Sequence, residues 1–143
     1  MSRSKTILLV LIVLMGCKET TSQSEGKLAA WTDATNYVGI ARVIVTVANG
    51  LNSTVYLRHC NNHIAFYIER KDSTWVDAGD EGILCAAMYA SGFMPLKTRE
   101  SVSDTFCLPQ SGHFRLRLPY SLQQDGLNQI YLFSNEYYNY NPR

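Results

Sequence analysis

Residues 41–60, ARVIVTVANGLNSTVYLRHC, contain two runs of β-branched and aromatic residues. In the first run Val43, Val45 and Val47 occupy every second position, so an extended strand would place all three on one face. Between the runs, residues 49–53 read NGLNS, a composition typical of a turn. This stretch therefore predicts two consecutive β-strands joined by a short turn.

Further segments with the same character follow along the chain. They lie at residues 64–70, 75–76, 101–108, 112–120 and 128–138. In the run HFRLRLP, Phe114, Leu116 and Leu118 alternate with Arg115 and Arg117, which predicts an apolar inner face and a cationic outer face. About seven short strands separated by turn residues, with no amphipathic helix, predict an all-β antiparallel sandwich.

The amino-terminal stretch differs from everything that follows. Arg3 and Lys5 precede an unbroken apolar run at residues 7–15, which is too short to span a bilayer and has the length of a signal-peptide core. The following LMGC, ending at Cys17, resembles the lipobox of bacterial lipoproteins. That resemblance implies that residues 1–16 are a lipoprotein signal peptide and that Cys17 carries the lipid, with acyl chains such as palmitate as the anchor. The alternative is an ordinary secretory signal.

The composition after the signal peptide restricts the class of partner. Removing residues 1–16 leaves 11 Lys and Arg against 12 Asp and Glu, so there is no cationic excess for binding nucleic acid. Residues 17–34 are polar through their first half, and we expect them to be the lipidated cysteine followed by a flexible tether. Residues 35–143 are then one domain, which we expect to be monomeric. By resemblance, Lys18 rather than Asp after the cysteine favours the outer membrane.

The domain resembles those of small bacterial lipoproteins that carry one immunoglobulin-like domain. The motifs are TVANGLNSTVYLRHC, FYIERKDSTWV, GHFRLRL and SNEYY, together with Cys85, and they extend from Val43 to Tyr137. The resemblance implies an immunoglobulin-like β-sandwich in the cell envelope and no particular biochemical activity. This chain departs from the pattern at Cys107 and at an added loop, residues 121–128.

Three cysteines remain if Cys17 is lipidated: Cys60, Cys85 and Cys107. Disulfides persist in the oxidising periplasm, and three cysteines allow three single pairings. We favour Cys60–Cys85, which would close a loop of about 25 residues and stabilise the fold by roughly 3–4 kcal/mol. Cys107 is then expected to be a buried thiol, with a reactive or metal-binding thiol as the alternative.

Motifs for catalysis or cofactor binding are weak. His59, Cys60 and His63 invite a zinc site, but their spacing matches no zinc finger or ribbon. There is no nucleophile elbow and no glycine-rich phosphate loop. The acids of the segment DAGDEG, which begins at Asp77, are more typical of a turn than of a calcium site. We therefore expect no enzyme activity, no cofactor and no metal.

The end of the chain is rich in tyrosine. Tyr137, Tyr138 and Tyr140 could be core residues of a last strand or could form a contact surface. On these grounds we expect a membrane-anchored, non-catalytic binding or accessory module with an envelope protein as partner. The alternative is a protease inhibitor acting through the loop at residues 121–128.

Overall fold

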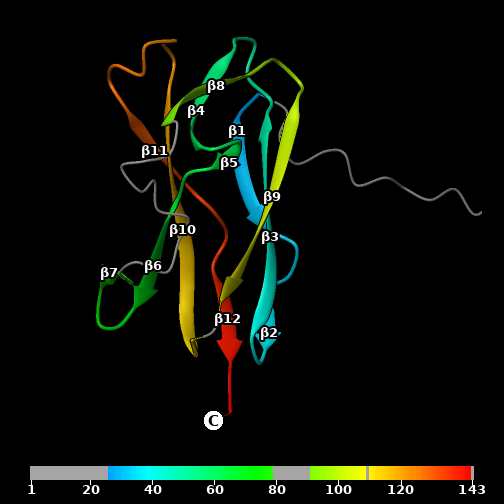
Figure 1. The fold of residues 1–143 in the computed structure, drawn as a ribbon, viewed down its shortest axis with the longest axis vertical. Helices are drawn as coiled ribbons and strands as arrows, with labels where there is room; N and C mark the ends of the chain where they lie inside the picture. Colours follow the sequence, from blue (N-terminus) through cyan, green and yellow to red (C-terminus); the bar gives the residue numbers. More distant parts are fainter. Residues whose placement is uncertain (1–25, 79–90, 109, 143) are drawn as a thin grey trace, which may run out of the picture.

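The computed structural model describes residues 26–78, 91–108 and 110–142, and these residues form two β-sheets (Figure 1). The smaller sheet has the antiparallel order β1 (Leu28–Thr32), β3 (Ala41–Asn49) and β9 (Ser101–Leu108). The remaining strands belong to the larger sheet. They are β2 (Asn36–Val38), β4 (Val55–Cys60), β5 (His63–Ile64), β6 (Tyr67–Lys71), β7 (Trp75–Asp77), β8 (Ser91–Leu96), β10 (Gly112–Ser121), β11 (Ile130–Phe133) and β12 (Tyr137–Tyr140).

Strand β10 runs through the centre of the larger sheet. Along one edge it pairs with β4 and then with β6, and along the other it pairs with β11 and then with β12. Phe114, Leu116 and Leu118 are completely buried, whereas the side chains of Arg115 and Arg117 lie on the outer face. The expected alternation of this strand, and the expected all-β class, are confirmed.

The described residues contain twelve strands, more than the seven expected, because two of the expected runs are interrupted and because β1, β2 and β8 were not expected. Along one edge of β10, Tyr120 pairs with Leu57 and Arg117 pairs with Tyr67. The two β10 residues are three positions apart in sequence, whereas their two partners are ten positions apart. The seven additional residues form the tight β4–β5 hairpin, whose turn residues Asn61 and Asn62 have positive φ angles, as hairpin turns of two residues require. The expected strand at 64–70 is thus divided into β5 and β6.

The folded domain begins earlier than expected. Strand β1 lies within the stretch predicted to be a flexible tether, and its five residues pair in register with residues 45–49 of β3. The segment LAAWT is apolar enough to bury Ala30 against the core, which explains why it adds to the sheet. The predicted signal peptide, Cys17 and the first part of the predicted tether lie outside the described residues. In the described ranges no helix is long and apolar enough to cross a membrane.

The two sheets pack face to face around one apolar core. The small sheet contributes Val43, Val45 and Val47, all completely buried, as their alternation predicts. The ring of Phe66, in the link between β5 and β6, lies 4.8 Å from that of Phe106 in β9 of the small sheet. Burying one such side chain contributes about 1.5–3 kcal/mol to the free energy of folding. Burial of this shared core is therefore the main contribution that holds the two sheets together.

The chain passes from the small sheet to the large one at a corner after β1. The carboxylate of Asp33 accepts hydrogen bonds from the backbone N–H of Ile44 (2.8 Å) and from the hydroxyl of Tyr37 (2.7 Å). Burial raises the pKa of Asp33, but these two hydrogen bonds outweigh burial and leave the pKa below its usual value. Beyond this corner, β2 runs parallel to β12.

Tyr37 should make the stability of the fold pH-dependent in alkali. Burial, and then its hydrogen bond to Asp33, raise the pKa of Tyr37 to about 12. An unfolded tyrosine ionises near pH 10, so this stabilisation is complete below about pH 10 and is lost as the pH rises through about 12. Two pKa units correspond to about 2.7 kcal/mol, which solvent screening of this partly exposed group reduces to about 1–2 kcal/mol.

The measurement is urea unfolding of the wild type and Tyr37→Phe across this range. We expect the wild type to be more stable at about pH 8 and the difference to shrink toward about pH 12. A difference that stays constant with pH would contradict this role of the hydroxyl.

Candidate functional site

The outer face of the larger sheet carries two arginines that are each held between aromatic rings. The guanidinium carbon of Arg115 lies 4.4 Å from the ring centroid of Trp75 and 4.2 Å from that of Phe133. That of Arg117 lies 4.8 Å from the ring of Tyr67 and 4.9 Å from that of Tyr131. These separations fall within the range of cation–π attraction, which contributes about 0.5–1 kcal/mol per pair at exposed sites.

Strand register explains how residues distant in sequence meet here. Arg117 of β10 is directly opposite Phe133 of β11 on one side and Tyr67 of β6 on the other. Residues directly opposite in an antiparallel pair share a face, so these side chains all point outward. Trp75 reaches the same face from β7 because it is opposite Lys71 of β6, whose ammonium lies 5.3 Å from the indole centroid.

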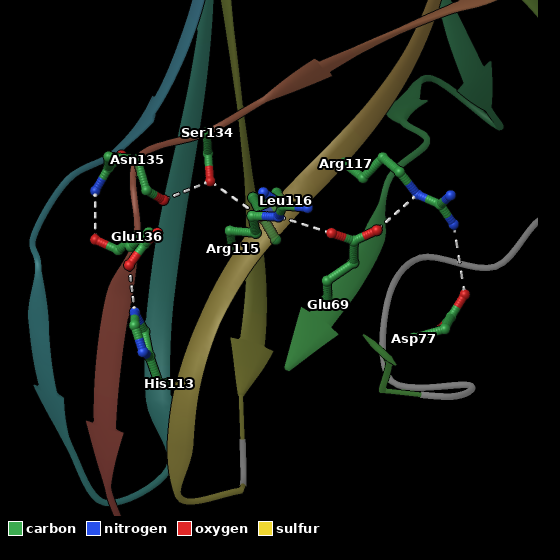
Figure 2. A network of polar contacts seen from close by, with 9 residues as sticks. All are labelled: Glu69, Asp77, His113, Arg115, Leu116, Arg117, Ser134, Asn135 and Glu136. Atoms are coloured by element: carbon green, nitrogen blue, oxygen red, sulfur yellow. Dashed lines mark hydrogen bonds and ion pairs between the residues drawn. The ribbon is translucent and has the colours of Figure 1, made fainter. Parts of the chain in front are cut away.

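Glu69 of β6 lies between the two arginines (Figure 2). Arg115 Nε donates a hydrogen bond to Glu69 Oε2 (2.7 Å), and Arg117 Nε is 3.2 Å from Glu69 Oε1. The second contact is an ion pair whose angle does not suit a hydrogen bond, since Arg117 Nε has no aligned acceptor among the described residues. Arg117 also approaches Asp77 Oδ2 at 3.7 Å. Glu69 is itself buried, and these arginines lie beside its carboxylate as counter-charges.

A second aromatic group continues the face toward the other end of β10. The imidazole of His113 stacks on the ring of Tyr138 (centroids 4.1 Å apart) and meets the edge of Trp75 (5.3 Å). Its Nε2 lies 2.7 Å from Glu136 Oε2, also without hydrogen-bond alignment. We call the whole surface the aromatic–arginine face. It comprises Tyr67, Trp75, His113, Arg115, Arg117, Tyr131, Phe133 and Tyr138.

A β-bulge between β11 and β12 decides which tyrosines reach this face. Leu118 is opposite Leu132, but Phe114 is opposite Tyr137, so the outer strand carries one additional residue. At the bulge, Ser134 N–H donates to Leu116 O (3.0 Å), and Leu116 N–H donates to Ser134 Oγ (2.9 Å), as Figure 2 shows in part. An extra residue reverses the alternation of a strand, so Tyr137 turns inward and Tyr138 outward.

The prediction that Tyr137 belongs to a contact surface is therefore wrong. Tyr137 is completely buried, with its ring against Phe114 and edge-on to Tyr37, and burial raises the pKa of its hydroxyl. Neighbouring residues of a strand face opposite sides, so Tyr137 and Tyr138 could not both be exposed. Tyr138 (50% exposed) and Tyr140 (66%) remain accessible.

The described cysteines and histidines do not gather into one site. Cys60 is buried at the end of β4, and Cys85 lies outside the described residues, so their pairing stays a prediction. Cys107 is a free thiol and is exposed, contrary to the expected buried thiol, because Phe106 and Leu108 take the inward positions of β9.

His63, one of the residues considered for a zinc site, contacts a carboxylate: its Nδ1 lies 3.0 Å from Asp104 Oδ1. Among the described residues, no three His, Cys, Asp or Glu side chains are placed to hold a metal ion.

The added loop at residues 121–128 is internally hydrogen-bonded. Ser121 Oγ donates to Leu127 O (2.6 Å) and accepts from Gln123 N–H (3.0 Å). Gly126 has a φ of +72°, and Phe93 occupies the space that a side chain there would need. The loop is thus a rigid element that rests on β8.

No protein-family model matches this chain, and no curated protein matches it significantly. The site must therefore be interpreted from its own geometry. The alternation of HFRLRLP predicts the outward arginines, but their aromatic partners come from three other strands whose register no local pattern reveals.

Removing the charge of Glu69 should destabilise the domain. Glu69→Gln would leave two partly buried arginines without their shared carboxylate, and we expect a loss of about 1–3 kcal/mol in the free energy of unfolding. The matched control is Asp72→Asn, which removes an exposed ion pair with Arg70 (3.2 Å) and should cost about 0.5 kcal/mol or less. Urea unfolding at neutral pH measures both, and equal losses in the two variants would show that Glu69 does not organise the face.

Proposed function

We propose that this chain is a bacterial lipoprotein, anchored through lipid on Cys17, whose non-catalytic domain binds a protein of the cell envelope. The amino-terminal signal and the lipobox-like LMGC support the anchor, and Lys18 after Cys17 supports an outer-membrane location by resemblance. The aromatic–arginine face is the observation that supports binding. It combines large rings with arginines that are already fixed in place.

The chemistry of this face is that of protein interfaces rather than of catalysis. Aromatic residues and arginine are enriched in interfaces and in their energetic hot spots. Tyr131 and Phe133 are 45% and 42% exposed, so each ring packs on an arginine through one side and presents the other to solvent. Because the arginines are held by Glu69, binding would immobilise few additional side chains.

We also propose that the domain is immunoglobulin-like. Three features of the topology support this. Strands β1, β3 and β9 share one sheet, and they are the first, second and fifth strands when β4 to β7 count as the third, β8 as the fourth and β11 with β12 as the last. Strand β10, which is then the last but one, is central in the other sheet, and the chain crosses between the sheets after β1. Immunoglobulin domains place strands A, B and E together and strand F between C and G. Here β4 and β6 would correspond to C, and β11 and β12 to G.

Capture of the partner by in-cell crosslinking tests the binding function. Tyr131→Ala and Phe133→Ala should each weaken capture by roughly tenfold or more, because truncated hot-spot residues typically cost about 2 kcal/mol or more. The control is Ile44→Ala, an exposed apolar residue of the small sheet. Equal capture by all variants would contradict a binding role for the face.

The same experiment separates the alternative function, a protease inhibitor. The rigid loop at residues 121–128, with Leu122 and Leu127 exposed, favours that alternative. Crosslinks from this loop to a protease, unaffected by Tyr131→Ala, would support inhibition instead.

A disulfide between Cys60 and Cys85 completes the proposal. The exposed thiol of Cys107 supports it, because that cysteine is left unpaired. Non-reducing peptide mapping of protein purified from the envelope should give one crosslinked peptide pair containing Cys60 and Cys85, with Cys107 open to alkylation. A pair that contains Cys107 would overturn this assignment.

A further inference from the structure

The described chain begins at one end of the sandwich, drawn at the top of Figure 1. Gly26 N–H donates to Gly50 O (3.0 Å), and Gly50 N–H donates to Lys27 O (2.9 Å), so the chain enters beside the turn that follows β3. The end of β8, the start of β9 and the end of β10 lie at the same end of the molecule. We call this surface the tether-proximal end. It consists of residues 26–27, 50–54, 97–100 and 122–130.

Apolar side chains project from this end on a rigid support. Leu122 is 54% exposed, Leu127 is 61% exposed and Ile130 is 44% exposed. The hydrogen bonds of Ser121 and the packing of Gly126 on Phe93 hold the loop in shape, so these side chains cannot easily fold back onto the domain. Three exposed apolar side chains held on one fixed loop form a candidate contact surface.

The charges at this end suit phosphate groups. Lys27, Lys97 and Arg99 are all exposed here. Two carboxylates lie among them, so three cations and two anions leave a net charge of +1 at this end. Each carboxylate accepts a hydrogen bond from its own turn: Glu100 Oε2 from Lys97 N–H (2.8 Å) and Asp125 Oδ1 from Leu127 N–H (3.0 Å). Apolar side chains beside cations are the usual composition of a surface that rests in the headgroup region of a bilayer.

The short chain between Cys17 and Gly26 favours the bilayer as the partner of the tether-proximal end. Nine residue steps separate Cys17 from Gly26, which span about 32 Å at most when extended and about 17 Å on average when flexible. A lipid on Cys17 would therefore keep the tether-proximal end within reach of the membrane at high effective concentration.

We propose that the tether-proximal end rests on the lipid bilayer, with Leu122 and Leu127 inserted at the boundary between headgroups and acyl chains. This inference rests on the lipid anchor of the proposed function. It fixes the orientation of the domain: β12 and the turn after β2 point away from the membrane, and the aromatic–arginine face stands at its side, open to a partner.

Fluorescence quenching in reconstituted vesicles tests the orientation. Full-length lipidated protein is placed in phosphatidylcholine and phosphatidylglycerol vesicles with brominated acyl chains, carrying either Leu127→Trp or the control Val38→Trp. Val38 is 75% exposed, more than Leu127, but β2, to which it belongs, lies at the opposite end. Trp31 and Trp75 are present in both variants and cancel in the comparison.

Brominated lipid should reduce the emission added by the tryptophan at position 127 by about half, because an inserted side chain lies about 5–10 Å into the boundary. The emission added at position 38 should not change. Adding Leu122→Asp to Leu127→Trp should bring the quenching down toward that of the control.

The mass of the amino-terminal peptide is measured on the same sample, so that the two proposals can fail separately. Lipidated protein without selective quenching at position 127 would overturn the orientation and leave the lipoprotein assignment standing. Absence of lipid on Cys17 would overturn the proposed anchor, and the orientation with it.

Discussion

The alternation of β10, paired along both edges, is the constraint on which the rest of the structure depends. Its inward residues Phe114, Leu116 and Leu118 close the core against the small sheet, and the same strand must then present Arg115 and Arg117 outward. Two neighbouring guanidinium groups on one outer face are stabilised by an opposite charge and by aromatic rings that pack on them. Glu69 supplies the charge, and the rings of neighbouring strands supply the cover. The core and the candidate site are therefore two consequences of one alternating strand.

Irregularities along the edges of β10 give this face its composition. The bulge at Ser134 lets Phe133 and Tyr138 point outward while Tyr137 remains in the core, an arrangement that strict alternation forbids. On the opposite edge, the hairpin inserted between β4 and β6 sets which residue of β6 meets Arg115, and that residue is Glu69. A shift of one position in either register would replace an outward residue by an inward one and separate the arginines from their partners.

Features that depend on local pattern were predictable, and features that depend on register were not. The valines of β3 and the alternation of β10 could be inferred because one strand determines its own faces. The extent of β1 was missed because LAAWT follows a polar segment and becomes a strand only by pairing with β3. The aromatic partners of the arginines lie 14 to 50 residues away in sequence, and only the paired strands bring them together.

The same contacts that stabilise the face also make it suitable for recognition. An isolated exposed arginine would lose side-chain freedom on binding, but Arg115 and Arg117 have already lost it on folding. Tyr131 and Phe133 keep one side open to solvent, so a partner that covers them would bury apolar area without displacing the ion pairs beneath. Stability and binding therefore do not compete at this surface, because Tyr131 and Phe133 contact the arginines through one side of each ring and leave the other side for a partner.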